Sequence, residues 1–331
     1  MIITKAPFRV SFVGGGSDME EFYSSEPGAV LSVTINKYMY ISSHKFFDTN
    51  KLRVKYARTE TVENVDQLQH PIVREVLRQF RIDGALEVSS NGDVPSGTGL
   101  ASSSAFTVAL LCNLYARTGV FATKEKLAAE ACDIEINRLH EPIGKQDQYA
   151  CAYGGLNVLR FLSSGAVSVE PLHIRREIYK TLSDNLLMFY TGEQRNASTI
   201  LAEQKKNTIS PEKRAVLRRM VEFVDDAHSA IYSGDLAEFG RILHENWLLK
   251  KTLASRISNS LIDEAYDTAM KNGALGGKLL GAGGGGFLLF YCEPQHQPRL
   301  RGALSSMREM RFKLENEGAK LVYAGDEYWQ D

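Results

Sequence analysis

The sequence lacks most features that mark membrane proteins and nucleic-acid-binding proteins. Its 331 residues carry 39 Lys and Arg against 40 Asp and Glu, a net charge of -1, without a basic tract. Nucleic acids and anionic membrane surfaces attract clustered positive charge, so neither is an expected partner. No apolar run approaches the roughly 20 residues that a membrane span needs.

Cysteine is also scarce. Most of the four cysteines lie inside apolar runs and none forms a CxxC pair: Cys112, Cys132, Cys151 and Cys292. This usage is typical of reduced core residues. The first residues, MIITKAPFRVSF, contain no apolar stretch long enough for a signal peptide. We therefore expect a soluble cytoplasmic protein.

The length favours two domains over one. Period-2 and continuous apolar patterns predict strands over 1–13, 28–46, 51–57, 85–90 and 186–190, with a hairpin over 156–172. Residues 197–232 and 235–272 instead have the charged outer faces of amphipathic helices. This change in composition places a boundary near 175–190, and we predict domains at 1–180 and 181–331.

Residues 93–117, DVPSGTGLASSSAFTVALLCNLYAR, predict a loop that opens directly into a buried helix. Gly97 and Gly99 allow the backbone to approach a ligand, and the unpaired N–H groups of the first helical turn favour an anion. A helix terminus offers only about half an elementary charge, so a triphosphate also needs a metal ion and other cations. The three serines at 102–104 supply hydroxyls for that ion. A glycine turn followed by a serine N-cap is the simpler alternative.

Three carboxylates stand where a ligand could use them, and each has a simpler interpretation. Asp18 follows the strand 1–13 and three glycines, where it could contact a ligand or cap the short helix after it. Glu135 lies late in a helix predicted over 124–139. There the helix dipole disfavours a carboxylate unless a cation is near, although a solvated surface glutamate is the alternative. Asp147 follows a glycine-bearing turn and could face a ligand or cap a helix.

The segment 273–292, GALGGKLLGAGGGGFLLFYC, ends in a predicted strand. Gly281, Gly283 and Gly286 satisfy GxGxxG formally, but a dinucleotide fingerprint follows a strand and opens a helix. A dehydrogenase is therefore disfavoured. A loop that packs against a substrate or against the first phosphate loop explains the glycines, with a tight hairpin as the alternative.

In this order, the motifs resemble the superfamily of galactokinase, homoserine kinase, mevalonate kinase and phosphomevalonate kinase (GHMP kinases) over nearly the whole chain. Its three motifs resemble residues 7–18, 95–105 and 278–286. APFRVSFVGGGSD, GKQDQYACAYGG and YTGEQR are most similar to the D-glycero-D-manno-heptose 7-phosphate kinases. The resemblance implies a two-domain α+β fold, with an N-terminal ribosomal-S5-like α/β domain and a C-terminal ferredoxin-like α+β domain.

The resemblance also implies a role for each matched residue. Asp147 corresponds to the aspartate beside the acceptor hydroxyl, Arg9 to its basic partner, and Ser103 with Glu135 to the magnesium ligands. The nucleotide-binding residues implied are Pro95, Ser96, Gly97, Thr98, Gly99, Leu100, Ala101, Ser102, Ser103 and Ser104. The substrate-binding candidates are Gly14, Gly15, Gly16, Ser17, Asp18, Lys145, Arg195, Gly283 and Gly284.

Two features bear on the acceptor. Galactokinase carries an acidic residue and a histidine where Gly15 and Gly16 stand, so galactose is a poor match. An acceptor that already carries a phosphate needs cations of its own, and Lys145, Arg138 and Arg195 are the candidates. Each of these three could equally be a solvated surface charge.

The resemblance implies ATP-dependent phosphorylation of the anomeric (C1) hydroxyl of D-glycero-D-manno-heptose 7-phosphate, with ATP and Mg2+ as cofactors, for nucleotide-activated heptose. The alternatives are a kinase for another free sugar such as L-fucose or galactose, a mevalonate kinase, and a catalytically silent sensor of ATP and sugar. The intact set of Arg9, Glu135 and Asp147 counts against the sensor. We expect a small sugar phosphate as the partner, and a monomer or homodimer.

Overall fold

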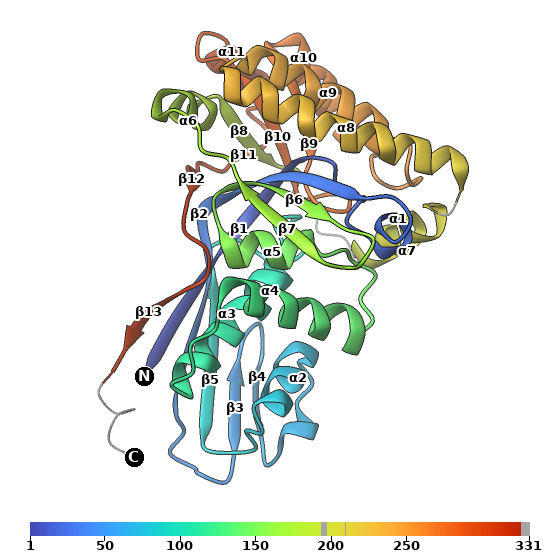
Figure 1. Ribbon diagram of the computed structural model, residues 1–331. Coiled ribbons are helices and arrows are strands. Elements are labelled where there is room, and N and C mark those ends of the chain that lie inside the picture. Colours follow the sequence, from blue (N-terminus) through green and yellow to red (C-terminus); the bar gives the residue numbers. More distant parts are fainter. Residues whose placement is uncertain (193–196, 209, 326–331) are drawn as a thin grey trace.

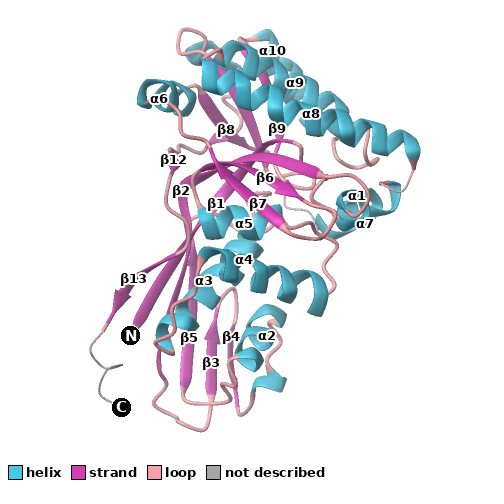
Figure 2. Cartoon of the chain, in the orientation of Figure 1, coloured by secondary structure: helices cyan, strands magenta, loops and turns pink. Residues whose placement is uncertain are grey.

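The computed structural model describes residues 1–192, 197–208 and 210–325, in which two sheets are covered by helices (Figure 1, Figure 2). The strands of the larger sheet are β1 (Ile2–Val13), β2 (Gly28–Lys45), β3 (Leu52–Lys55), β4 (Thr59–Val62), β5 (Leu86–Gly92), β6 (Leu156–Phe161), β7 (Val167–Pro171), β12 (Leu314–Glu315) and β13 (Lys320–Ala324). Those of the smaller sheet, in the order β11-β8-β10-β9, are β8 (Leu186–Tyr190), β9 (Ala274–Leu279), β10 (Phe287–Cys292) and β11 (Arg308–Glu309). The mixture of helix and sheet confirms the α+β class.

The α-helices are α1 (Glu20–Tyr23), α2 (Pro71–Gln79), α3 (Ser102–Arg117), α4 (Lys124–Cys132), α5 (Gln146–Tyr153), α6 (Arg176–Asp184), α7 (Ala197–Asn207), α8 (Pro211–Ser233), α9 (Leu236–Lys251), α10 (Ser260–Lys271) and α11 (Gln297–Ala303). A 3-10 turn lies at Val65–Gln67 and a π-helical segment at Asp133–Arg138. Within the described residues, every helix is too short or too polar to span a lipid bilayer.

Strand β1 supports the site because it is covered on both faces. Helices α3, α8 and α9 all contact it, and residues 6–13 are all buried. The strand pairs with β2 along most of its length, where Arg9 lies opposite Thr34. An arginine in the middle of such a strand is kept from water, so it must find its partners inside the protein.

Helix α3 is apolar on nearly all sides, as a buried helix must be. It packs on β1, β2 and α5. The Thr4 hydroxyl on β1 donates to the Ala109 carbonyl oxygen at 2.8 Å, which adds a polar contact to the apolar packing. The rigid packing fixes the position of the helix N-terminus at Ser102.

The predicted strands and the hairpin at 156–172 are confirmed, but several predicted helices are interrupted. The helix expected over 124–139 begins at Lys124, as predicted. The Thr123 side chain caps it, and the helix then widens into the π-helical segment. The helices expected over 197–232 and 235–272 each divide in two. Pro211 starts α8 afresh, because proline suits the first turn of a helix better than its interior.

After the smaller sheet the chain returns to the larger one. Strand β12 pairs with β2, and β13 pairs with β1 so that Ala324 lies opposite Ile2 (Figure 1). The larger sheet therefore contains strands from both ends of the described chain. The smaller sheet begins at Leu186, while the domain division at 180/181 stays a prediction.

Candidate active site

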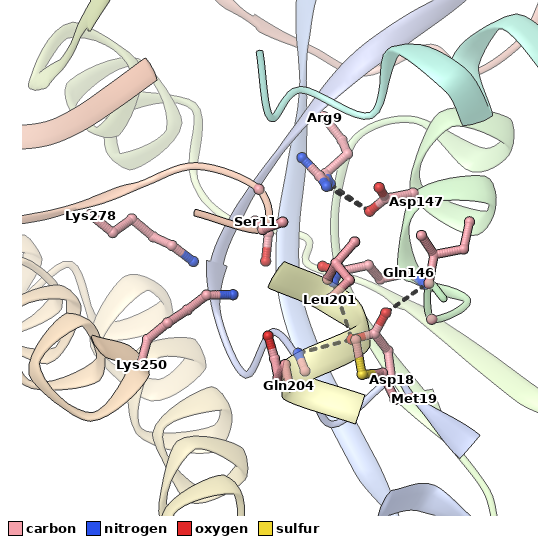
Figure 3. Close-up of a pocket in the computed structure, with 15 residues that line it drawn as sticks. Arg9, Ser11, Asp18, Met19, Gln146, Asp147, Leu201, Gln204, Lys250 and Lys278 are labelled. Atoms are coloured by element: carbon pink, nitrogen blue, oxygen red, sulfur yellow. Dashed lines mark hydrogen bonds and ion pairs between the residues drawn. The ribbon is translucent and has the colours of Figure 1, made fainter. Parts of the chain in front are cut away.

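Two adjoining pockets lie at one end of β1. The inner pocket is lined by polar side chains that include Ser11, Asp18, Gln146, Gln204, Lys250 and Lys278 (Figure 3). The loop pocket is lined by Gly97, Gly99, Ser102, Ser103, Ser104 and Gly283. Arg9 and Asp147 line both pockets, so this pair marks the place where the two pockets meet.

The N-terminus of α3 opens on the loop pocket without a side-chain cap. Ala101 occupies the N-cap position with φ 64°, in the left-handed region, and makes no capping hydrogen bond. The serine N-cap alternative is therefore wrong, and the N–H groups of the first helical turn remain available to an anion. The hydroxyls of Ser103 and Ser104 point elsewhere, to Glu135.

The glycine-rich loop between β9 and β10 packs directly on the phosphate loop. Gly99 has φ +84°, and a Cβ at this position would lie 2.3 Å from the Leu280 carbonyl oxygen. A Cβ on Gly281 would lie 2.5 Å from the Gly99 Cα. This close approach confirms the expectation that the two loops touch, and the same loop also joins the antiparallel strands of a hairpin. Both glycines are needed because any side chain would separate the backbones.

Arg9 connects these loops to Asp147. Its Nε and Nη2 atoms contact Asp147 Oδ1 at 2.8 and 2.7 Å, and its Nη1 donates to the Gly99 carbonyl oxygen at 2.7 Å. Both contacts to Asp147 use one oxygen, and Oδ2 has no hydrogen-bond partner among the described residues. Asp147 is the second residue of α5 and does not occupy its N-cap, which is Lys145. Its carboxylate therefore serves the ion pair and the pocket.

Glu135 is fully buried, which excludes the solvated-surface alternative. Its carboxylate accepts four hydrogen bonds, from Ser103 Oγ at 2.6 Å, Ser104 Oγ at 2.8 Å, Thr107 Oγ1 at 3.2 Å and Gln148 Nε2 at 2.6 Å. Burial raises the pKa of Glu135, and the hydrogen bond from Ser103 is the largest effect that opposes the shift. Glu135 lies in the π-helical segment, a feature that is frequent at functional sites.

Ser103 and Glu135 fit a magnesium ion chemically. Hydroxyl and carboxylate oxygens are the donors Mg2+ prefers, and Ser103 is exposed at the loop pocket. In the part of the chain that the structure describes, no three His, Cys, Asp or Glu side chains group into a metal site. An ion bound here would therefore take its other ligands from water and from nucleotide phosphates, as Mg2+ commonly does.

Asp18 is the buried acid of the inner pocket. Its carboxylate accepts from the Gly16 N–H at 2.9 Å, from the Gln146 N–H at 3.3 Å and from Gln146 Nε2 at 3.1 Å. The N-cap of α1 is Met19, so the capping alternative for Asp18 is wrong. Burial raises the pKa of Asp18, and the nearby charge of Asp147 raises it further.

Two lysines that were not predicted as site residues point into the inner pocket from its other side (Figure 3). Lys250 on α9 is 6% exposed and has no hydrogen-bond or ion-pair partner in the described part of the chain. Lys278 on β9 is 2% exposed and donates to the Phe12 carbonyl oxygen at 3.0 Å. Burial lowers the pKa of Lys250 and holds that of Lys278 well below its ordinary value, where the charges of Lys250 and Arg9 add to the effect.

Lys145 and Arg138, two of the three predicted cations, lie outside the inner pocket. Lys145 Nζ donates to the Gly165 carbonyl oxygen at 2.6 Å and lines a separate hollow. Arg138 pairs with Asp133 at 2.7 Å on the surface. Arg195 lies outside the described residues. A role for any of them in substrate binding stays a prediction.

Several of the remaining predicted residues hold the loops in shape. The buried Ser17 hydroxyl donates to the carbonyl oxygens of Gly14 and Ala29 at 2.8 and 2.9 Å. The Thr98 hydroxyl donates to the Pro95 carbonyl oxygen at 2.9 Å. These side chains stabilise the two glycine turns from inside, so their contribution to a ligand would come through the backbone.

Comparison with known proteins identifies the family. The model for the GHMP kinases N terminal domain matches residues 68–155, and that for GHMP kinases C terminal matches residues 227–309. The chain is 30% identical to the D-glycero-alpha-D-manno-heptose 7-phosphate kinase of Campylobacter jejuni, over 96% of this chain and 98% of that one. It is 26% identical to the galactokinase of Pyrococcus furiosus, over 86% and 87% of the two chains.

Among solved structures, the D-glycero-D-manno-heptose 1-phosphate kinase from Bacteroides thetaiotaomicron superimposes with a TM-score of 0.81 at 26% identity, over 98% of this chain and 100% of that one. The fold, the two loops in contact and the Arg9–Asp147 pair are thus found in a chain that aligns along almost its whole length with sugar kinases. The protein belongs to the GHMP kinase family and is a sugar kinase.

Proposed function

We propose that this kinase transfers the γ-phosphoryl group of ATP to the anomeric C1 hydroxyl of D-glycero-D-manno-heptose 7-phosphate. The product, the 1,7-bisphosphate, would serve the synthesis of nucleotide-activated heptose. The observation that carries the proposal is the position of Asp147, paired with Arg9 where the two pockets meet. The relative from Campylobacter jejuni bears the name of a manno-heptose 7-phosphate kinase, which supports the choice of acceptor. The solved structure from Bacteroides thetaiotaomicron is named a manno-heptose 1-phosphate kinase, so its name supports a heptose phosphate as acceptor but not the position of its phosphate.

Asp147 is suited to orient the acceptor. Arg9 occupies its Oδ1, and Oδ2 is left to accept a hydrogen bond from the sugar hydroxyl. In the transfer the hydroxyl oxygen forms a bond to the γ-phosphorus, the bond to the β,γ-bridging oxygen breaks, and ADP leaves. The hydroxyl proton passes to the Asp147 carboxylate. Asp18 and Gln146, whose polar atoms line the inner pocket, would hold other hydroxyls of the sugar.

The loop pocket would hold the triphosphate. The uncapped first turn of α3 presents N–H groups to an anion, and the Gly99–Leu280 contact fixes the loop. Ser103 and Glu135 would hold a magnesium ion, which supplies neutralising charge at the phosphates when bound. Arg9 adds a cation between the two pockets. Phosphoryl transfer depends mainly on such positioning and neutralisation.

A panel of sugars and sugar phosphates tests the proposal. ADP release is measured for D-glycero-D-manno-heptose 7-phosphate, the free heptose, mannose 6-phosphate, L-fucose and galactose, and the product's new phosphate is located by NMR. We expect the highest kcat/KM with heptose 7-phosphate and a new phosphate on C1. A preference for an unphosphorylated hexose, or a phosphate on another carbon, contradicts the proposal.

A further inference from the structure

The inner pocket contains buried polar atoms that have no hydrogen-bond partner among the described residues. These atoms are Ser11 Oγ, Gln146 Oε1, Gln204 Nε2 and Gln204 Oε1. Their three side chains come from β1, α5 and α7 and line the same pocket. A buried polar group without a hydrogen bond destabilises the fold, and most such groups in proteins are paired. Their convergence on one space indicates a ligand that completes them.

The two lysines also indicate a ligand, because they place positive charge in the same pocket. The pocket lining includes three cationic side chains, Arg9, Lys250 and Lys278, against two carboxylates, Asp18 and Asp147. Both carboxylates already have donors: Arg9 for Asp147, and backbone and side-chain amides for Asp18. Among the described residues, neither lysine has a carboxylate in direct contact, and Asp18 and Asp147 act on Lys250 only through their nearby charges. A buried ammonium group without a carboxylate in contact is costly, and two such groups in one pocket also repel each other.

The backbone leaves room for a group beside these atoms. A Cβ on Gly15 would lie 3.5 Å from Ser11 Oγ, 3.6 Å from Lys250 Nζ and 3.8 Å from Gln146 Nε2. Three polar side chains thus surround the point where a side chain of residue 15 would begin. These distances are ordinary van der Waals contacts, so the Lys250 ammonium lies within contact range of the backbone at Gly15, the common neighbour of the other two polar side chains.

We propose that Lys250 and Lys278 bind a phosphate that the acceptor sugar already carries, so that the enzyme selects phosphorylated sugars over free ones. The inference rests on the proposed function and extends it to the residues that recognise the acceptor's phosphate. Ser11 Oγ and Gln204 Nε2 donate further hydrogen bonds to the same group, and the amide oxygens of Gln146 and Gln204 accept from hydroxyls of the sugar. Two anions then bind in adjoining pockets: the nucleotide phosphates at α3, and the acceptor phosphate at the lysines.

Lys250→Met and Lys278→Met test the assignment, because methionine keeps an unbranched side chain and removes the charge. Lys251→Met is the matched control: it is the next residue on α9, and its ammonium pairs with Asp263 at 3.0 Å outside the pocket. Kinetics are measured with two matched pairs of acceptors, heptose 7-phosphate with heptose and mannose 6-phosphate with mannose. We expect each site variant to lose about 10- to 100-fold in kcat/KM on the sugar phosphates, the usual effect of a lost charge-assisted hydrogen bond. Free sugars, the KM for ATP and the control should change by less than about threefold.

Titration calorimetry tests the lysine assignment by measuring sugar-phosphate binding, without catalytic turnover. Heptose 7-phosphate and mannose 6-phosphate are titrated into each protein in the presence of Mg2+ and a saturating non-hydrolysable ATP analogue, which fills the loop pocket. We expect binding by the wild type and the control and weaker binding by both site variants. Because Lys250 has no partner in the part of the chain that the structure describes, Lys250→Met should melt no lower than the wild type without ligand, which excludes misfolding as the cause.

Equal losses on phosphorylated and free sugars, a raised KM for ATP, or unchanged calorimetric binding would each overturn the lysine assignment. Failure of the proposed function looks different: the wild type would then turn over a free hexose best, or place the phosphate away from C1. In that case the calorimetry still decides the lysine assignment, because wild-type protein that binds neither sugar phosphate also refutes it.

Discussion

The two sides of the inner pocket differ in whether their buried charged groups have partners among the described residues. On the side formed by β1 and α5, the carboxylates of Asp147 and Asp18 are met by Arg9 and by amide groups. On the side formed by α9 and β9, Lys250 has no partner among the described residues and Lys278 has one carbonyl oxygen. The two carboxylates have donors before a ligand arrives, whereas the lysines would be completed by the proposed phosphate. Ser11 Oγ and Gln146 Oε1, which lie on the carboxylate side, lack partners among the described residues and would also be completed by the ligand.

We infer from this difference that the carboxylate side acts on the reacting atoms, whereas the lysine side selects the substrate. Groups that act on the reacting atoms gain from being fixed in advance, because no reorganisation is then needed during the reaction. Groups that recognise a remote part of the substrate can be left unsatisfied, since their cost in the free protein is recovered only with the right ligand. Substitutions on the two sides should therefore have different signatures, and four experiments sharpen or break that contrast.

Asp147→Asn should have the largest effect. Asparagine keeps the size and can still accept from Arg9, but it cannot take a proton and it presents an amide to the acceptor. We expect kcat to fall by about 10² to 10⁴-fold, with the Kd for ATP nearly unchanged. Steady-state kinetics and nucleotide binding measure the two quantities. An unchanged kcat would show that Asp147, and with it the carboxylate side of the pocket, does not act in phosphoryl transfer.

Gly99→Ala tests whether the carboxylate side depends on loop contact. The new Cβ would meet the Leu280 carbonyl oxygen, and the shift would move the carbonyl group that holds Arg9. A displacement of this kind costs about 100-fold in kcat/KM. Gly119→Ala is the control: its φ is also positive, at +67°, but nothing lies within 4 Å of the new Cβ. It should cost only about 1 kcal/mol of stability. Similar activity of the two variants would contradict the argument.

Ser103→Ala and Ser104→Ala compare two neighbouring serines that both donate a hydrogen bond to the Glu135 carboxylate. Ser103 is exposed at the loop pocket and Ser104 is buried, although both donate to Glu135. We expect Ser103→Ala to weaken binding of the magnesium–ATP complex by about 10-fold, through loss of a metal ligand. Ser104→Ala should mainly lower the free energy of unfolding, by about 1 kcal/mol. Nucleotide titration and denaturant unfolding separate the two effects, and reversed effects would count against Ser103 as a ligand.

The smallest expected effect is on stability against pH. The pKa of Lys250 is lowered in the folded state from the ordinary value of 10.5. Between these two pKa values the unfolded chain holds a proton that the folded protein lacks, so the free energy of unfolding rises with pH toward 10.5. Lys250→Met should lose part of this rise. The free energy of unfolding of both proteins is measured in urea across alkaline pH. Profiles with the same slope would show that folding does not lower the pKa of Lys250.

The sequence was informative wherever a short motif fixed both the backbone and the side chain. Gly97 and Gly99 ahead of a buried helix predicted an anion site at a helix N-terminus, and α3 has that form. The strands around Arg9 followed from their continuous apolar pattern. The roles of Asp147, Ser103 and Glu135 came from the family resemblance, and the structure places each of them at the loop pocket or beneath it. Their roles in the reaction stay predictions.

The lysine side was missed because it is assembled from distant helices and strands. Lys250 sits on the inward face of α9, after Phe239, Leu243 and Asn246 at helical spacing, and this pattern was the signal that could have revealed it. Lys278 stands inside an apolar strand segment, GGKLL, where an unpaired lysine is unexpected. The π-helical turn at Glu135 could not be predicted, because its sequence has ordinary helical periodicity and the extra residue per turn follows from packing.

The outermost strand of the larger sheet has a consequence for synthesis of the protein. Strand β1, which carries Arg9, receives its neighbour β13 from a part of the chain that is synthesised about 300 residues later. The phosphate loop likewise waits for the residues around Leu280. A nascent chain that has emerged only as far as α6 therefore has the motifs of a nucleotide site without the support that shapes it. Competence to bind ATP should arise only after the residues around Leu280 have been synthesised.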